Sequence, residues 1–164
     1  VLLVASILLA VGSVGYAVTV PPQGEQFSEF YLLTEDDDGA LVADGYPETF
    51  VAGEPRPLVV GIGNHEQRST QYTVVVEAHD IELLDGGNET RIRDRERLLT
   101  RTTTIGHNET RNFEIRPAPT MTGEEIRLTF LLYRGAASEV PASPDPDGAY
   151  RSVHLWIDVT ETEA

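Results

Sequence analysis

The first 20 residues, Val1 to Val20, contain no charged side chain and are almost entirely apolar. An α-helix rises about 1.5 Å per residue, so a helix of this length crosses roughly the 30 Å hydrocarbon core of a bilayer. Pro21 and Pro22 follow directly, and proline ends a helix because it lacks a backbone N–H. The sequence therefore predicts a transmembrane helix over residues 1–20, a linker over 21–26 and a water-exposed domain over 27–160.

Two other interpretations of this run stay open. Gly15-Tyr16-Ala17 places small residues where a signal peptidase cleaves, but a signal peptide has a basic start and a shorter apolar region, about 7–15 residues. A buried globular helix would carry more polar residues on one face. The chain begins at Val1 rather than Met, and we expect further membrane spans ahead of it. The anchor is the favoured interpretation, with a cell-membrane location and the C-terminal domain outside.

The remainder of the chain is acidic. The formal net charge is -15, and all 12 basic residues are arginine. This charge repels polyanions, so we exclude nucleic acid as a partner. Acidic, lysine-free composition fits concentrated salt, where a Debye length of about 3 Å screens repulsion between carboxylates. We therefore expect a halophilic source, an ordinary acidic extracellular domain being the alternative. The chain has no cysteine, which excludes disulfides and thiolate chemistry within it.

Beyond residue 26 the hydrophobic period is two, which is typical of β-strands. In Gln71–His79, Tyr72 and its alternate residues fall on one face, and Thr73, Val75, Glu77 and His79 on the other. Strands are predicted at 27–34, 58–62, 71–79, 91–104, 113–115, 126–132 and 153–159, and turns include Gly61–Glu66 and Pro141–Gly148. Seven or eight short strands predict an all-β fold, an immunoglobulin-like antiparallel β-sandwich. The expected core comprises Tyr72, Val74, Val76, Phe113, Leu128, Phe130, Leu155 and Ile157.

Several short segments of the sequence match motifs of a known family. They are Ser28–Leu33 with its acidic turn, Gly53–Arg56, Leu58–Glu66, Met121–Glu124 with Leu128–Arg134, and Tyr150-Arg151 with His154–Trp156. Through them residues 27–159 resemble the archaeal membrane-protein family of unknown function numbered 1616. The resemblance implies membrane helices ahead of this domain and agrees with a halophilic archaeal source. It carries no activity that could be transferred to this chain.

The sequence shows no recognisable catalytic motif. His65-Glu66 lacks the second histidine that a zinc-protease helix carries four residues after the first. The four histidines, at 65, 79, 107 and 154, are isolated, and a single strand histidine is far more often a surface or capping residue than a metal ligand. No serine lies in a Gly-x-Ser-x-Gly elbow. We therefore expect no enzymatic activity and no cofactor other than, at most, calcium.

Three features remain as candidate sites. Asn88 and Asn108 begin Asn-x-Thr sequons at turn signals and are predicted to carry glycans. Two acidic turns each resemble half of a calcium loop without its distal glutamate, and plain acidic turns are the alternative; their carboxylates are Asp36, Asp38, Asp145 and Asp147. Four alternating arginines would stack on one strand face, either to pair with neighbouring carboxylates or to bind an acidic glycan: Arg91, Arg93, Arg95 and Arg97.

Together these patterns favour a membrane-anchored surface module with a structural or interaction role in the cell envelope. Its expected partners are the membrane and other envelope proteins or surface glycans. One alternative is an accessory subunit of envelope glycan or surface-polymer assembly, in which upstream helices would hold the active machinery. Another is a substrate-binding or sensing module, which a concave apolar pocket in the sandwich would favour.

Overall fold

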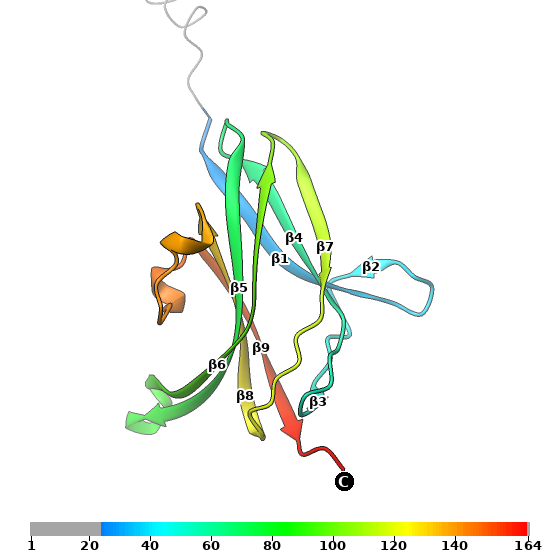
Figure 1. Cartoon of the computed structure of the whole chain (residues 1–164), viewed down its shortest axis with the longest axis vertical. Helices are drawn as coiled ribbons and strands as arrows, with labels where there is room; N and C mark the ends of the chain where they lie inside the picture. The colour runs from blue at the N-terminus through cyan, green and yellow to red at the C-terminus, as the bar shows by residue number, and fades with distance from the viewer. Residues whose placement is uncertain (1–23, 164) are drawn as a thin grey trace, which may run out of the picture.

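The computed structural model describes residues 24–163, and within that range almost every regular element is a strand (Figure 1). The strands are β1 (Phe27–Glu35), β2 (Leu41–Val42), β3 (Thr49–Val51), β4 (Leu58–His65), β5 (Thr70–Leu84), β6 (Glu89–Ile105), β7 (Thr110–Ile115), β8 (Gly123–Arg134) and β9 (Arg151–Thr160). Three short 3₁₀ turns, η1 (Asp85–Gly87), η2 (Ala137–Glu139) and η3 (Pro146–Gly148), lie between strands. The predicted transmembrane run lies outside the described residues, and no helix within residues 24–163 is long and apolar enough to span a membrane.

The strands form two sheets that pack face to face. One has the order β2-β1-β4-β7, and the other has the order β3-β9-β8-β5-β6. All pairings are antiparallel except that of β3 with β9. β1, β4 and β7 thus occupy the places of strands A, B and E of an immunoglobulin domain, and β9, β8, β5 and β6 those of G, F, C and C′. The predicted immunoglobulin-like sandwich is confirmed.

The hydrophobic core lies between the two sheets. Of the eight predicted core residues, six are at most 1% exposed: Tyr72, Val74, Val76, Leu128, Phe130 and Ile157. Phe113 and Leu155 are half-buried and pack against this core. The period-two alternation of β5, β8 and β9 therefore predicted the inward face of each strand correctly.

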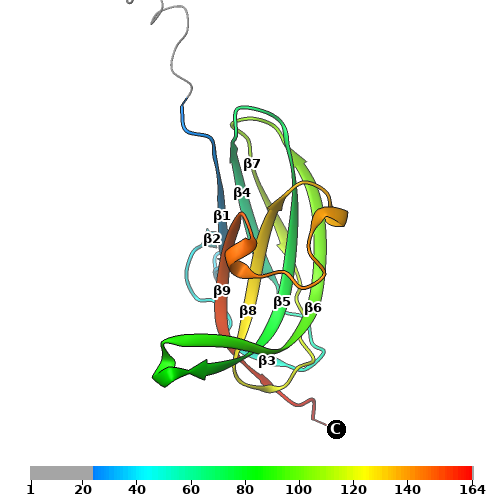
Figure 2. The same ribbon diagram turned by 90° about the vertical axis from the view of Figure 1, so that its left-hand side faces the viewer.

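The outer face of the five-stranded sheet is also covered. Residues 135–150, here called the strap, connect β8 to β9 and cross the face of β5 and β8 (orange in Figure 2). Beneath the strap, Thr73, Val75, Glu77 and His79 of β5 are at most 1% exposed. The prediction that His79 would be a surface or capping residue is therefore wrong, because a segment distant in sequence folds over it.

The predicted turn at Gly61–Glu66 is also wrong, since β4 continues to His65 and the turn follows it. The two glycines serve close packing inside the sheet. A Cβ on Gly61 would lie 2.1 Å from a ring carbon of Tyr31, and one on Gly63 would lie 2.5 Å from a carboxylate oxygen of Glu29. Both partners stand directly opposite on β1, so glycine here makes room for large cross-strand side chains.

β5 and β6 extend beyond the sandwich as a two-stranded arm. The pairing of β5 with β8 ends at His79, whereas its pairing with β6 continues to Leu84. This arm, residues 80–94, curves away from the sheet at the end opposite to the start of β1 (Figures 1 and 2). Bulges between Val76 and Glu77 and between Asp80 and Ile81 accompany the bend, as extra residues in β6 increase the local twist.

Candidate functional site

A layer of polar side chains lies between the five-stranded sheet and the strap. On β5, Glu77 stands opposite Arg97 of β6 and Thr129 of β8, and His79 stands opposite Arg95 and Arg127. Paired residues of neighbouring strands point to the same side of a sheet, so this register gathers them on the outer face. We call this set, together with Tyr133 of β8, the strap layer.

Glu77 is the centre of the strap layer and is 1% exposed. Its Oε2 lies 2.8 Å from His79 Nε2 and 3.5 Å from Arg95 Nη1, and its Oε1 accepts from Arg97 Nε and Nη2 at 3.4 and 3.3 Å. Burial by itself raises the pKa of Glu77, but the hydrogen bond from His79 and the charges of Arg95 and Arg97 outweigh that effect. The net effect is a pKa of Glu77 below its ordinary value.

The contacts of His79 define the orientation of its ring. Arg127 Nη2 lies 3.3 Å from His79 Nδ1, and Thr129 Oγ1 lies 3.2 Å from the same nitrogen. Because a guanidinium only donates hydrogen bonds, Nδ1 accepts and the ring proton sits on Nε2, where it faces Glu77. The histidine therefore links the buried carboxylate to β8.

Arginines attach the strap to this layer. Arg95 Nη1 donates to the carbonyl of Pro144 at 2.8 Å, and Arg97 Nη2 donates to the carbonyls of Pro141 and Ala142 at 3.4 Å. Two buried polar atoms of the layer, Arg127 Nε and Tyr133 Oη, have no hydrogen-bond partner among residues 24–163. Burial raises the pKa of Tyr133, and the charge of Glu77 adds to that effect, so its hydroxyl stays protonated.

A second buried carboxylate, Glu66, lies in the turn after β4 and is 1% exposed. Its Oε1 accepts from Ser28 Oγ at 2.8 Å and from the Tyr150 hydroxyl at 2.5 Å, and its Oε2 accepts from Arg134 Nη1 at 3.3 Å. Burial raises the pKa of Glu66, but the hydrogen bonds from Tyr150 and Ser28 and the charge of Arg134 together lower it below the ordinary value.

The ring of Tyr150 also lies against two arginines. The guanidinium carbon of Arg134 is 3.9 Å from the ring centroid and that of Arg151 is 4.8 Å from it. Arg151 in addition donates to the carbonyl of Ser28 at 3.2 Å. The contacts around Glu66 and Tyr150 therefore connect the start of β1 to the end of β8 and the start of β9.

A lowered pKa argues against a general-acid role for both carboxylates. A general acid working near neutral pH needs a raised pKa, and its proton must reach a bound substrate. Glu66 and Glu77 instead stay ionised and accept bonds from their own chain. Neither residue was predicted from the sequence to be a buried carboxylate. For Glu77, the one available signal was its position directly after the largely apolar run Tyr72–Val76. No comparable signal marked Glu66.

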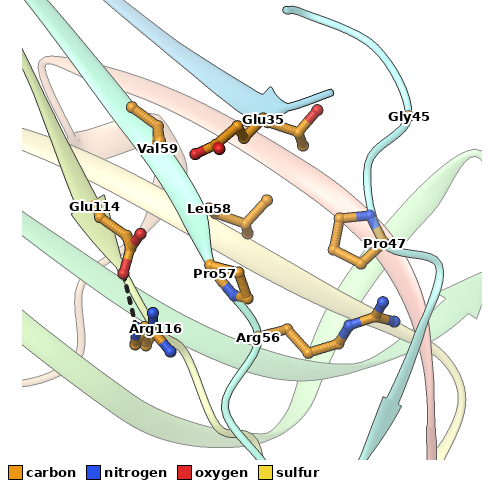
Figure 3. Close-up of a pocket in the computed structure, with 10 residues that line it drawn as sticks. Glu35, Gly45, Pro47, Arg56, Pro57, Leu58, Val59, Glu114 and Arg116 are labelled. Atoms are coloured by element: carbon orange, nitrogen blue, oxygen red, sulfur yellow. Dashed lines mark hydrogen bonds and ion pairs between the residues drawn. The ribbon is translucent and has the colours of Figure 1, made fainter. Parts of the chain in front are cut away.

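A cleft opens at one end of the four-stranded sheet, with a volume of about 450 Å³ (Figure 3). Arg56 and Arg116 line it together with Glu35 and Glu114, and Pro47, Pro57 and Leu58 supply apolar surface. Arg116 Nε donates to Glu114 at 2.7 Å, and the Arg56 guanidinium lies 5.8 Å from the Phe50 ring centroid. The cleft thus offers two guanidinium groups beside two carboxylates, and no pattern in the sequence predicted it.

The four alternating arginines do not form one continuous row. Arg95 and Arg97 lie on the outer face with Glu77, whereas Arg91 stands opposite Glu82, whose side chain alternates to the other face. The bulge between Asp80 and Ile81 causes this change of face. Each of the four pairs with a carboxylate of β5, including Arg91 with Glu82 and Arg93 with Asp80 at 2.9 Å.

The candidate calcium residues lie in two separate turns. Asp36 Oδ1 accepts from the backbone N–H groups of Asp38 and Ala40, at 3.0 and 2.8 Å, in the turn between β1 and β2. Asp145 Oδ1 accepts from the N–H of Asp147 at 2.9 Å and caps η3 in the strap. Among residues 24–163, no group of three or more His, Asp or Glu side chains is placed to hold a metal ion.

Both sequon asparagines are exposed and flank β6 at its two ends. Asn88 follows η1 at the tip of the arm, and Asn108 lies in the turn before β7 with a φ of 59°. Their glycosylation stays a prediction. Of the other histidines, His65 stacks on Phe27 with ring centroids 4.6 Å apart, and His154 lies 5.8 Å from the Trp156 ring.

Residues 21–158 match the family model described as a domain of unknown function, DUF1616. The chain belongs to this family. The sequence motifs indicated that residues 27–159 resemble family 1616, and this match confirms it. The archaeal source of this DUF1616 chain stays a prediction. No curated protein sequence matches the chain.

This DUF1616 domain is similar to several solved structures at low sequence identity. The CARDB domain of the PF1109 protein from Pyrococcus furiosus, in complex with di-metal ions, is 11% identical with a TM-score of 0.47, covering 85% of this chain and 99% of that one. A PapD-like domain of human CEP192 is 10% identical with a TM-score of 0.41, covering 88% and 94%. A β-glucosidase from Listeria innocua is 13% identical with a TM-score of 0.43, covering 84% of this chain but only 17% of the enzyme.

Proposed function

We propose that this chain is a membrane-anchored surface module with a structural or interaction role in the envelope of a halophilic archaeon. The juxtaposition of two segments carries the proposal: a charge-free run over residues 1–20 is separated from β1 only by residues 21–26. Six residues span at most about 20 Å when fully extended. The Phe27 end of the sandwich then faces the membrane, and the arm and the end of β9 point away from it.

The buried charges support a structural or interaction role. Glu66 and Glu77 are both satisfied by side chains of their own domain, and both have a lowered pKa. The exposed residues of the four-stranded sheet, such as Phe27 and Glu29, and the loops are available to partners. The net charge of -15 and the absence of lysine support a role in concentrated salt.

Labelling of a single cysteine tests the orientation, because the chain contains no cysteine of its own. Ser138 lies exposed in η2, so Ser138→Cys should react with a membrane-impermeant maleimide on intact cells. The parent protein is the matched control and should not react at this domain. Labelling that requires permeabilised cells would overturn the outside location.

Thermal melting across a salt series tests the halophilic part. With a net charge of -15, self-repulsion grows as salt is diluted, so the melting temperature should fall. A melting temperature that stays level or rises on dilution would contradict a protein adapted to salt.

A binding or sensing module is the second candidate, and the cleft of about 450 Å³ favours it. This volume lies within the range of about 300–1,000 Å³ typical of ligand pockets. Titration with glucuronate, followed by NMR, should shift the signals of Arg56 and Arg116 and leave an Arg116→Ala variant unresponsive. Absence of saturable shifts in the parent would reject the cleft as an acidic-sugar site.

A further inference from the structure

The arm and the outer face of β9 enclose an apolar groove around the single tryptophan of the chain. Trp156 is 48% exposed and Leu83 is 61% exposed. Ile81 and Leu83 of the arm line a depression of about 180 Å³ together with Trp156 and Glu125. Large apolar side chains gathered in this way on a surface mark a site of interaction.

A second depression, of about 300 Å³, also has Trp156 in its lining. Asp44, Tyr46 and Glu48 line it together with Pro47 and Leu155. Trp156 therefore lines two hollows, an apolar one formed with the arm and a mixed one formed with the segment before β3. A bound segment could contact both hollows and the indole that they share.

Carboxylates surround the tryptophan. Asp44, Glu48 and Glu125 line the two hollows, and Asp158 accepts from the backbone N–H of Glu125 at 3.0 Å. All four are exposed, and none forms an ion pair within residues 24–163. The cation nearest in register, Arg127, stands opposite Trp156 but reaches toward His79 instead.

The backbone presents Glu125 to this groove at a local cost. β8 has a register shift between Gly123 and Ile126, and Glu125 within it has a φ of 56°. This left-handed conformation is uncommon for a residue other than glycine. Conformations of this kind gather at functional sites, where surrounding structure maintains them.

We propose that this groove binds an arginine-bearing segment of a partner protein. A guanidinium lies favourably over the face of tryptophan, the best aromatic ring for a cation, and its methylene stem packs on apolar surface. The surrounding carboxylates attract a cation and repel acidic glycans and polyanions. Trp and Arg are also the residues that most often dominate the energy of protein interfaces.

This inference names the partner chemistry of the proposed interaction role and rests on that role. It is tested independently of membrane orientation, so failure of either is distinguishable. The arm, which supplies Ile81 and Leu83 to the groove, lies at the end of the sandwich opposite to the start of β1 (Figures 1 and 2). A membrane surface at the Phe27 end would therefore leave it free.

Trp156 fluorescence provides a direct reporter, since the chain has one tryptophan. The full chain in lipid nanodiscs is titrated with an end-blocked Gly-Arg-Gly-Arg-Gly peptide and with its citrulline analogue, which has the same shape without the charge. The arginine peptide should change the emission saturably, and the citrulline peptide should bind at least about tenfold more weakly. Equal binding of the two peptides, or no saturable change with either, would overturn the proposal.

Variants assign the binding to the groove. By calorimetry, Trp156→Ala should abolish binding of the arginine peptide, and the Glu48→Gln/Glu125→Gln pair should weaken it about five- to tenfold. Asp37→Asn, an exposed carboxylate in the turn between β1 and β2, should bind as the parent does. Each variant should melt like the parent, because the altered side chains are exposed. Binding unchanged in Trp156→Ala, tighter binding of a uronic-acid oligosaccharide in the groove, or self-association that Trp156→Ala removes would each overturn the proposal.

Discussion

The two faces of β5 are equally buried but differ in chemistry. Toward the other sheet, Tyr72, Val74 and Val76 pack in an apolar core, whereas Glu77 and His79 point outward beneath the strap. The inner face needs only a matching apolar surface. The outer face buries ionisable groups, so each charge requires a partner, and those partners come from β6 and β8. A polar face can therefore be covered when an adjacent strand supplies its counter-ions.

The largest contrast is expected from placing an unpaired charge on the apolar face. Val76→Asp should unfold the domain, because an uncompensated carboxylate in the core costs several kcal/mol against a total stability of about 5–15 kcal/mol. Circular dichroism of the purified variant provides the measurement. Thr100→Asp, at an exposed position of β6, is the control and should melt cooperatively. A cooperative melt for Val76→Asp would mean that the two faces had been assigned the wrong way round.

Removal of the charge from the outer face should have the next largest effect. Glu77→Ala leaves Arg95, Arg97 and His79 without their shared partner and should lower the unfolding free energy by about 3–5 kcal/mol. Glu82→Ala removes the exposed pair with Arg91 and should cost less than about 1 kcal/mol. Urea unfolding compares the two variants. Similar losses in both would show that the strap layer behaves like an exposed surface.

Acid should reduce the stability contributed by the outer face of β5 and leave the contribution of the apolar inner face unchanged. The folded pKa of Glu77 is lowered, so its contribution is fully present above the unfolded value of about 4.3 and is lost as the pH falls through the folded value. Glu77→Gln has no such group and should lose less stability between about pH 6 and about pH 3 than the parent. Parallel curves for the two proteins would contradict a lowered pKa at this position.

The sequence predicted the strands of the sandwich better than the environment of its polar residues. The alternation of Tyr72 to His79 correctly predicts which side chains point together, because the period of a strand is fixed by its backbone. Burial of Glu77 and His79 depends on the strap, a segment more than 50 residues later, and local pattern carries no information about such contacts. β2 and β3 are too short to show any period.

Two further differences between the predicted and the observed structure have local causes, which become visible only once the pairing of the strands is known. Gly61 and Gly63 resemble turn residues, yet the side chains of Tyr31 and Glu29 occupy the space above them. Arg91 to Arg97 alternate in sequence, but a bulge moves Arg91 to the other face. The sequence predicted Arg95 and Arg97 as candidate site residues, but it did not predict that both pair with the buried carboxylate of Glu77.

Direct titration of Glu77 tests the central claim, that the covered polar face is a structural layer built around an ionised carboxylate. Side-chain carboxyl labelling and NMR can follow this residue, with Glu77→Gln to assign its signal. We predict a pKa of Glu77 below the ordinary glutamate value of about 4.3, because His79, Arg95 and Arg97 outweigh the effect of burial. A pKa of Glu77 above that value would contradict the account, since a protonated buried carboxyl beside a histidine marks a chemical site instead.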